Sequence, residues 1–247
     1  MLKSRGAQVI KHASATALAC TEEGWPHTVH WTRSGVTHKT QFDCLIDCSG
    51  REGALKKASV INRFHHSTLR NIALWFYKSD LPLEGFGAEG TIRILSIEDG
   101  WVWLIPLQKN VVNVGVVIHQ DRLKNNSKEG KQELCFLALR QAASLKGVLD
   151  LETEKLTSKL YIETDFSYTS DRFCGPGFPA CGDAACFIDP LLSSGVHLAM
   201  MSGVTAAASV HSILTNEISE TRALNYFEMT YRKCYIRYLI LCRRSMI

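Results

Sequence analysis

Several features that define common classes of protein are missing from this 247-residue sequence. The formal net charge of +4 is spread along the chain without a basic arm, so no nucleic-acid partner is expected. The nine cysteines are an odd number at irregular spacing, and no charged-then-apolar signal segment precedes them. We therefore expect reduced thiols in a cytoplasmic protein, not a secreted disulfide framework.

Metal-ligand spacing and a clear membrane span are missing as well. Zinc sites use short paired C-x-x-C ligands, which this sequence lacks. Cys174, Cys181, Cys186 and His197 have the residue types of a metal site, but small buried thiols explain these cysteines equally well. The longest uncharged run, residues 190–216, contains two histidines, two glycines and several hydroxyl side chains. Its composition predicts a helix buried in a globular protein and no stable membrane span.

The residues that are present, 46% apolar and 21% charged, allow a substantial core in one or two domains. Short alternating runs with turns at Glu23-Gly24 and Ser34-Gly35 predict a β-meander over residues 8–41. A second, antiparallel sheet and two helices are expected further along the chain. The expected ranges are strands at 71–77, 91–97, 100–106, 111–118 and 160–165, and helices at 124–145 and 217–244.

Three short segments have the residue types of a ligand site. Asp47-Cys48-Ser49-Gly50-Arg51 follows the apolar run 44–46, as at the carboxyl end of a buried parallel strand, where α/β sheets bind ligands. Asp183, in Gly182-Asp183-Ala184, has a carboxylate suited to a ribityl or ribose hydroxyl, although a lone Asp after a strand is more often a turn residue. Ser193-Ser194-Gly195 begins a helix without an acidic first turn. Its free amides suit an anion, unless Ser193 or Ser194 simply caps an ordinary helix.

The stretch "WVWLIP", residues 101–106, raises a separate question. In a strand, Trp101 and Trp103 project from one face, while Val102 and Leu104 project from the other. Two neighbouring indoles form either part of a core against the helix at 124–145 or a wide, rigid apolar wall beside a ligand. The stretch by itself supports both interpretations.

The combination of "DCSGR", "WVWLIP" and "CGDAACFIDPLLSSGVHLA" resembles the flavin-dependent halogenases, and their fungal phenol-type members more than the tryptophan type. The resemblance runs over essentially the whole chain, and Trp101-x-Trp103-x-Ile105-Pro106 matches the family signature at every fixed position. It implies an α/β (α+β) fold: an incomplete FAD-binding three-layer βαβ domain, an antiparallel-sheet substrate domain and C-terminal helices. The implied division is 1–60 and 171–215 for FAD, 61–170 for the substrate, and 216–247 for the C-terminal helix.

The same resemblance implies roles for individual residues. Ser194 and Gly195 would bind chloride or bromide through their backbone amides. The residues that would form a barrier between flavin and substrate are Trp101, Trp103 and Pro106. The residues that would line or lie near FAD are Asp47, Gly50, Arg51, Asp183 and Val196. In this scheme a separate flavin reductase supplies FADH2, the reduced flavin and oxygen oxidise the halide, and a lysine delivers the halogen to an electron-rich arene.

The sequence departs from the family pattern in two places. Where tryptophan halogenases carry a glutamate, this chain has Leu192, which favours a phenolic substrate, free or carrier-bound, because a phenolate activates its own ring. The G-x-G-x-x-G turn that binds the FAD pyrophosphate and the catalytic lysine beyond it have no match. We therefore expect an N-terminally truncated halogenase of secondary metabolism, with its catalytic residue unknown. The alternatives are an FAD-dependent aromatic hydroxylase (monooxygenase) and an inactive fragment.

Overall fold

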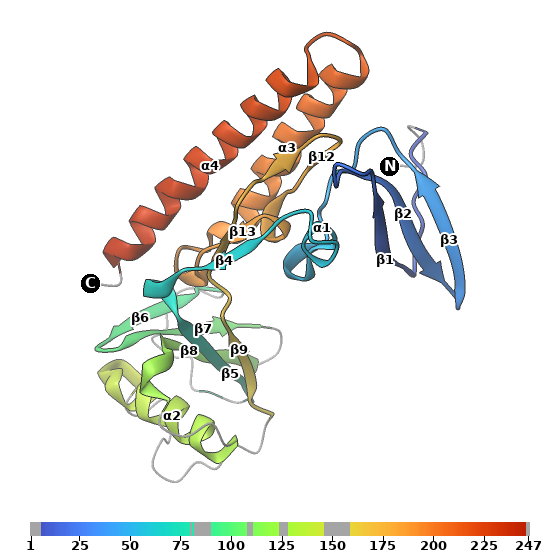
Figure 1. The fold of residues 1–247 in the computed structure, drawn as a ribbon. Helices are drawn as coiled ribbons and strands as arrows, with labels where there is room; N and C mark the ends of the chain where they lie inside the picture. Colours follow the sequence, from blue (N-terminus) through green and yellow to red (C-terminus); the bar gives the residue numbers. More distant parts are fainter. Residues whose placement is uncertain are drawn as a thin grey trace. The chain divides into compact units, whose positions relative to one another are not determined.

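The computed structural model describes residues 6–79, 81, 90–107, 111–123, 128–145 and 159–245 (Figure 1). The chain divides into two compact units, Met1–Phe64 with Tyr168–Leu241, and His65–Ser167 with Cys242–Ile247. The backbone thus leaves the first unit after Phe64 and returns to it at Tyr168. This mixed α and β architecture agrees with the predicted fold class.

The first unit begins with an antiparallel meander. Strands β1 (Ala13–Cys20), β2 (Pro26–Arg33) and β3 (Val36–Gln41) form a sheet in the order β1-β2-β3. The connecting turns hold Gly24 and Gly35 at φ of +86° and +79°, a conformation that side chains disfavour. The meander predicted over residues 8–41 is therefore confirmed.

Short elements follow the meander. In place of the predicted buried strand at 44–46, the structure has an isolated parallel bridge from Asp47 to Ala180, and Leu45 and Ile46 are half-buried. Two small sheets have the strand orders β13-β10-β4 and β11-β12. The strands are β4 (Arg63–His65), β10 (Tyr168–Ser170), β11 (Cys174–Gly175), β12 (Phe178–Pro179) and β13 (Cys186–Phe187). The short helices are η2 (Gly50–Glu52), α1 (Ala54–Lys57), η6 (Gly182–Ala184) and η7 (Pro190–Leu192).

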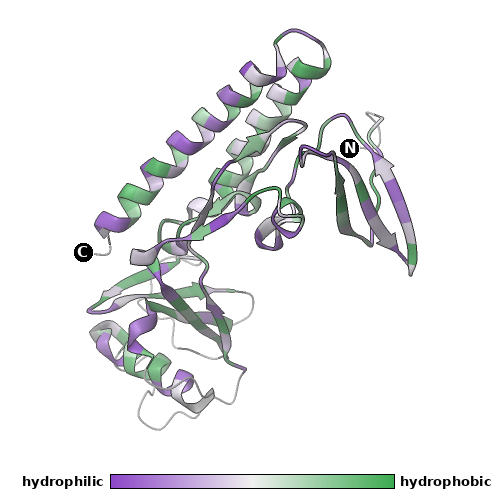
Figure 2. Cartoon of the chain, viewed as in Figure 1, coloured by the Kyte–Doolittle hydropathy of each residue, from purple (hydrophilic) through white to green (hydrophobic). Residues whose placement is uncertain are grey.

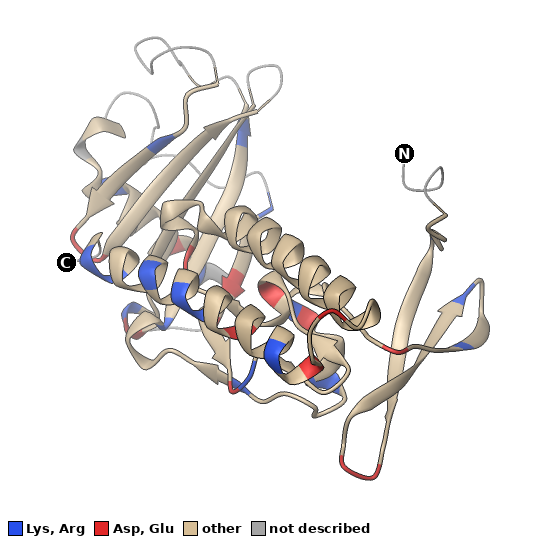
Figure 3. Cartoon of the chain, turned by 90° about the horizontal axis from the view of Figure 1, so that it is seen from above, with Lys and Arg blue, Asp and Glu red and all other residues tan. Residues whose placement is uncertain are grey.

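Two long helices, α3 (Ser194–Leu214) and α4 (Glu220–Ser245), run side by side (Figures 1 and 3). The rings of His197 and Tyr238 lie 5.6 Å apart between them. Charged side chains recur along α4 and are missing from α3, which is the more apolar of the two (Figures 2 and 3).

The helix predicted in the uncharged run is present, but it is buried on one side only. Leu198, Ser202 and Ala206 of α3 are buried, but Val196, Met200 and Val204 on another side are about 70% exposed. Only 28% of the most apolar window of α3 is buried, and among the described residues α3 alone is long and apolar enough to cross a membrane. A helix with one face in a protein core can satisfy the same criterion of length and composition.

The second unit is built on one antiparallel sheet in the order β6-β7-β8-β5-β9. Its strands are β5 (Asn71–Ser79), β6 (Arg93–Ile97), β7 (Gly100–Pro106), β8 (Val111–His119) and β9 (Tyr161–Thr164). Helix α2 (Lys128–Gln141) packs on one face, where Leu74, Val102 and Val114 form a core with Phe136 and Leu139. The remaining short helices are η3 (Ser67–Leu69), η4 (Gln120–Arg122) and η5 (Ala143–Leu145). The antiparallel sheet and its helix were predicted at these places.

Candidate functional site

Two of the three predicted ligand segments meet at the parallel bridge in the first unit. Leu45 N–H donates to the Gly177 carbonyl at 2.8 Å, and Asp47 N–H donates to the Pro179 carbonyl at 2.9 Å. Cys181 N–H donates back to the Asp47 carbonyl at 2.9 Å. These bonds place the turn after Asp47 beside the turn at Gly182, although the two segments are far apart along the chain.

The carboxylate of Asp47 holds the first of these turns. It is 3% exposed and accepts hydrogen bonds from Ser49 N–H at 2.8 Å, from Ser49 Oγ, and from Leu55 N–H at 3.0 Å. Ser49 Oγ in turn accepts from Ala54 N–H at 2.7 Å. Gly50 has a φ of +70° and open space where a Cβ would be. Asp47 is thus engaged within the protein, and the small, open residue at the turn is Gly50.

The second turn, at Gly182, is held by buried polar side chains from both long helices. Gly182 N–H donates to Ser202 Oγ at 3.0 Å, and the Tyr231 hydroxyl donates to the Gly182 carbonyl at 3.1 Å. Ser202 and Tyr231 are fully buried. Gly182 has a φ of +55°, a conformation that favours glycine, and a Cβ there would make a tight 3.0 Å contact with the Cβ of Ala199.

Asp183 lies half-buried next to this turn, in a positively charged setting. Burial raises the pKa of its carboxyl above the ordinary value of 3.8, and the charges of Arg63 and Arg51 oppose part of that rise. Its carbonyl accepts from the Tyr168 hydroxyl at 2.6 Å. A carboxylate with this environment can accept hydrogen bonds from the hydroxyl groups of a ligand.

Arg63 and Tyr168 connect the two turns and were not recognised from the sequence. The guanidinium of Arg63 lies 3.9 Å from the centroid of the Tyr168 ring, and its Nη1 donates to the Arg51 carbonyl at 2.6 Å. Its Nε and Nη2 are buried and have no partner among the residues that the structure describes. No local pattern distinguishes Arg63 from the other arginines, because its neighbours come from distant segments.

The third predicted segment forms the start of α3. Ser193 occupies the N-cap position with a left-handed φ of +50°, but its side chain makes no capping bond within the described part of the chain. Ser193 therefore takes the predicted N-cap position, without a side-chain capping bond to the first turn. Asp189 instead caps the preceding η7, accepting from Leu191 N–H at 3.0 Å. Ser194 is 4% exposed, whereas Val196 is 71% exposed.

The motif residues Trp101 and Trp103 lie on the sheet face opposite α2. Their neighbours Val102 and Leu104 are fully buried in the core under α2, so the indoles do not pack on that helix. The interpretation of these tryptophans as core against the helix at 124–145 is wrong. Pro106 ends the same strand, opposite Val112.

The indoles belong to a continuous aromatic face. We define it by Trp75, Tyr77, Trp101, Trp103 and Tyr161. Ring centroids are 5.4 Å apart for Trp101 and Trp103, 6.4 Å for Trp103 and Trp75, and 5.6 Å for Trp75 and Tyr161. Trp75 and Tyr161 are stacked at 14°, and Tyr77 meets Tyr161 edge to face. The face presents a broad aromatic surface on a rigid sheet.

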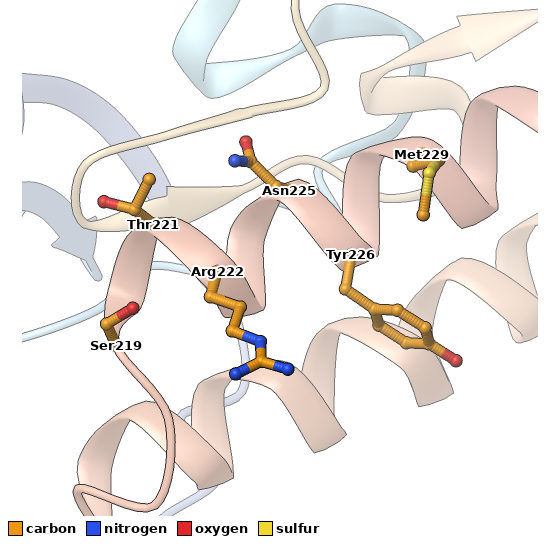
Figure 4. Close-up of a pocket in the computed structure, with 6 residues that line it drawn as sticks. All are labelled: Ser219, Thr221, Arg222, Asn225, Tyr226 and Met229. Atoms are coloured by element: carbon orange, nitrogen blue, oxygen red, sulfur yellow. The ribbon is translucent and has the colours of Figure 1, made fainter.

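One further hollow in the first unit contains no residue that was predicted for the site. A hollow of about 450 Å³ lies along α4 (Figure 4). The residues that line it are Ser219, Thr221, Arg222, Asn225, Tyr226 and Met229.

Among the described residues, no group of three His, Cys, Asp or Glu side chains is arranged for a metal ion. Burial raises the pKa of the Cys174 and Cys186 thiols to about 12, which keeps them protonated.

Comparison with known proteins assigns the chain to a family. The sequence model of the tryptophan halogenase family matches residues 2–242. The chain is 36% identical to a tryptophan 2-halogenase of Chondromyces crocatus and 34% identical to the sulochrin halogenase of Aspergillus terreus. These alignments cover 87% and 88% of this chain but 42% and 41% of the relatives. The chain belongs to the tryptophan halogenase family and spans less than half the length of these relatives.

Solved structures give the same result for the fold. The flavin-dependent halogenase CmlS matches with a TM-score of 0.80 at 30% identity, over 96% of this chain and 42% of that protein. The myxobacterial chondrochloren halogenase CndH matches with a TM-score of 0.78 at 27% identity, over 93% of this chain and 53% of that protein. Each match extends across both units.

Proposed function

We propose that the protein performs FADH2-dependent chlorination or bromination of an electron-rich phenol in secondary metabolism. The observation that carries this proposal is the complete W-x-W-x-I-P motif, in a chain of this family, on a sheet face that α2 leaves uncovered. A rigid aromatic face suits a barrier that keeps a flat substrate from the flavin while the oxidised halide passes. In this proposal the second unit receives the substrate and the first receives the cofactor.

The residues of the first unit fit one edge of a flavin. Gly50 leaves open space at the first turn, and Asp183, half-buried beside the second turn, is suited to a ribityl hydroxyl. The buried Nε and Nη2 of Arg63 are donors without a partner among the described residues, so an anionic or carbonyl-rich group nearby would stabilise them. When bound, reduced FAD would react with oxygen, and this chemistry would oxidise the halide.

The start of α3 is the proposed halide site. The backbone amides of Ser194 and Gly195 lie at the positive end of a helix without an acidic residue in its first turn. Val196 would contribute to the flavin side of the same helix start. Leu192 replaces the glutamate of tryptophan halogenases and supports a phenolic substrate, free or carrier-bound. The sulochrin halogenase among the relatives is consistent with this substrate class.

Two further components would come from outside the matched motifs. A flavin reductase would supply FADH2, and a lysine would carry the halogen. The described lysines Lys11 and Lys39 stand in no motif of that kind, so the catalytic residue is left unassigned. We place the reaction in the cytoplasm, where a reductase and reduced thiols are both available.

The proposal is tested by assay of the 247-residue chain, alone and joined to the N-terminal part of the sulochrin halogenase. Each protein is incubated with FAD, a flavin reductase, chloride or bromide, and a phenolic polyketide. Mass spectra are expected to show the chlorine or bromine isotope pattern in the product. The matched control replaces both Trp101 and Trp103 by Leu, which should shift product from halogenated to oxygenated.

The alternatives predict different results in the same assay. An aromatic hydroxylase would give an oxygenated product without halogen, and replacement of the two tryptophans would leave or improve its activity. An inactive fragment would give no product, and titration with FAD would show no quenching of flavin fluorescence. Either result in both forms of the protein would contradict the proposed halogenation.

A further inference from the structure

Gly115, in the middle strand of the second unit, lies under the indole of Trp103. It is the register partner of Trp103 on β7 and of Trp75 on β5. A Cβ built at Gly115 would overlap Cζ2, Cε2 and Cη2 of the Trp103 ring. Gly115 is therefore required by close approach, since any side chain would occupy the volume that the indole fills.

Asn113, two residues earlier on the same strand, binds the N–H of this indole. The Nε1–H of Trp103 donates to Asn113 Oδ1. Asn113 is the register partner of Ile105, and Gly115 is that of Trp103. The Asn113 side chain and the open position at Gly115 therefore lie on the same sheet face as the Trp103 indole. One residue sets the position of the indole plane, and the other sets its rotation.

The two motif tryptophans differ in the hydrogen bonding of the indole N–H. Trp101 is 5% exposed, and its Nε1 has no hydrogen-bond partner among the described residues. Trp103, whose Nε1 is bonded, lies between Trp101 at 5.4 Å and Trp75 at 6.4 Å, with planes tilted by 46° and 43°. Trp103 is the central ring of the aromatic face, and β8 holds it from below.

We propose that Gly115 and Asn113 are positioning residues that hold Trp103 flat against the sheet and so set the shape of the barrier. This inference rests on the proposed function, because it assigns the barrier to the aromatic face. A side chain at position 115 would lift the indole, and loss of the acceptor at position 113 would let it rotate. Either change would open the aromatic face between Trp101 and Trp75.

The position of the indole is tested in the 247-residue chain without any cofactor. Gly115→Ala should lower the melting temperature by roughly 5 °C and reduce the near-ultraviolet circular dichroism of the coupled indoles. Gly203→Ala is the matched control, because a Cβ at Gly203 meets nothing within 4 Å. In a Trp103→Leu background, Gly115→Ala should have almost no effect. An equal loss in both backgrounds would show that the glycine serves the strand alone and would overturn the proposal.

The acceptor is tested through a conservative variant. Asn113→Leu should change the circular dichroism of the indoles and raise the ratio of oxygenated to halogenated product severalfold in the assay described above. Asn113→Asp keeps an oxygen acceptor and should restore both readouts most of the way. Unchanged spectra and product ratio in Asn113→Leu would overturn the positioning role. Absence of halogenation in the unmodified protein, with the Gly115–Trp103 coupling intact, would overturn the proposed function and leave the positioning role standing.

Discussion

The two units are stabilised in different ways. The second unit has a continuous five-stranded sheet whose inner face and α2 bury Leu74, Leu104 and Leu139 completely. The first unit, outside its meander, has strands of two or three residues and relies on buried hydrogen bonds around Gly182 and Asp47. Both units bury apolar side chains, including Phe173, Phe178 and Phe227 in the first, but buried side-chain hydrogen bonds hold the turns of the first unit in addition.

The two units also differ in the kind of apolar side chain that they present outside their cores. In the first unit Val196, Met200 and Val204, four residues apart on α3, are exposed. Figure 2 shows that α3 is more apolar than α4. In the second unit the sheet face opposite α2 is aromatic, with Tyr77 exposed, Trp103 partly buried and Trp101 buried. An aromatic sheet face is suited to a flat ligand, whereas an aliphatic helix face is suited to packing against another apolar surface.

The largest effect is expected for the core of the second unit. Leu139→Ala should lower the free energy of unfolding by about 2–5 kcal/mol, because the fully buried side chain leaves a cavity. Leu137→Ala, on the same helix but 48% exposed, should change it by less than about 1 kcal/mol. Urea unfolding followed by tryptophan fluorescence measures both. Similar losses for the two variants would contradict the assignment of the buried face of α2.

An intermediate effect is expected for the polar network of the first unit. Ser202→Ala removes the acceptor of the buried Gly182 N–H and should cost about 1–3 kcal/mol. Ser212→Ala is the matched control on the same helix, since its hydroxyl bonds the exposed Glu217 and should matter little. Thermal unfolding by circular dichroism, with hydrogen exchange at Gly182, gives the measurement. Unchanged exchange at Gly182 in Ser202→Ala would argue against this hydrogen bond.

The smallest effect concerns the pH dependence of the first unit. Burial raises the folded-state pKa of Asp183 above 3.8, so its ionisation opposes folding as the pH rises through the folded-state pKa. Asp183→Asn stays neutral and should therefore be slightly more stable than the unmodified chain at neutral pH. The difference should disappear below the unfolded-state pKa. Melting temperatures over a pH series test this, with Asp121→Asn as the exposed control; a stabilisation that persists in acid would contradict it.

The regular elements of the fold could be predicted because their signals are local. The alternation in "WVWLIP" and the turn at Asp99-Gly100 predict a strand over residues 100–106, where β7 lies. Turn glycines likewise predict the meander. The N-cap position of Ser193 could be predicted from residue type, whereas its left-handed backbone and the lack of a side-chain capping bond could not, because a serine before a helix defines only a preference.

The candidate site was predicted only in its separate pieces. Asp47, Asp183 and Ser194 could each be selected from residue type and position. Their neighbours Arg63 and Tyr168 could not, because these are brought together by the return of the chain to the first unit at Tyr168. A contact between distant segments leaves no periodic signal in either one.

The sequence by itself determined which residues share a face: the period of two in a strand places Trp101 and Trp103 together and Val102 and Leu104 opposite. It could not determine which of the two faces α2 covers, since both are apolar. The tertiary structure decided this by packing the aliphatic side against α2. It also decided that Gly115 lies under Trp103, because register between strands depends on pairing across the sheet and not on the order of residues along one strand.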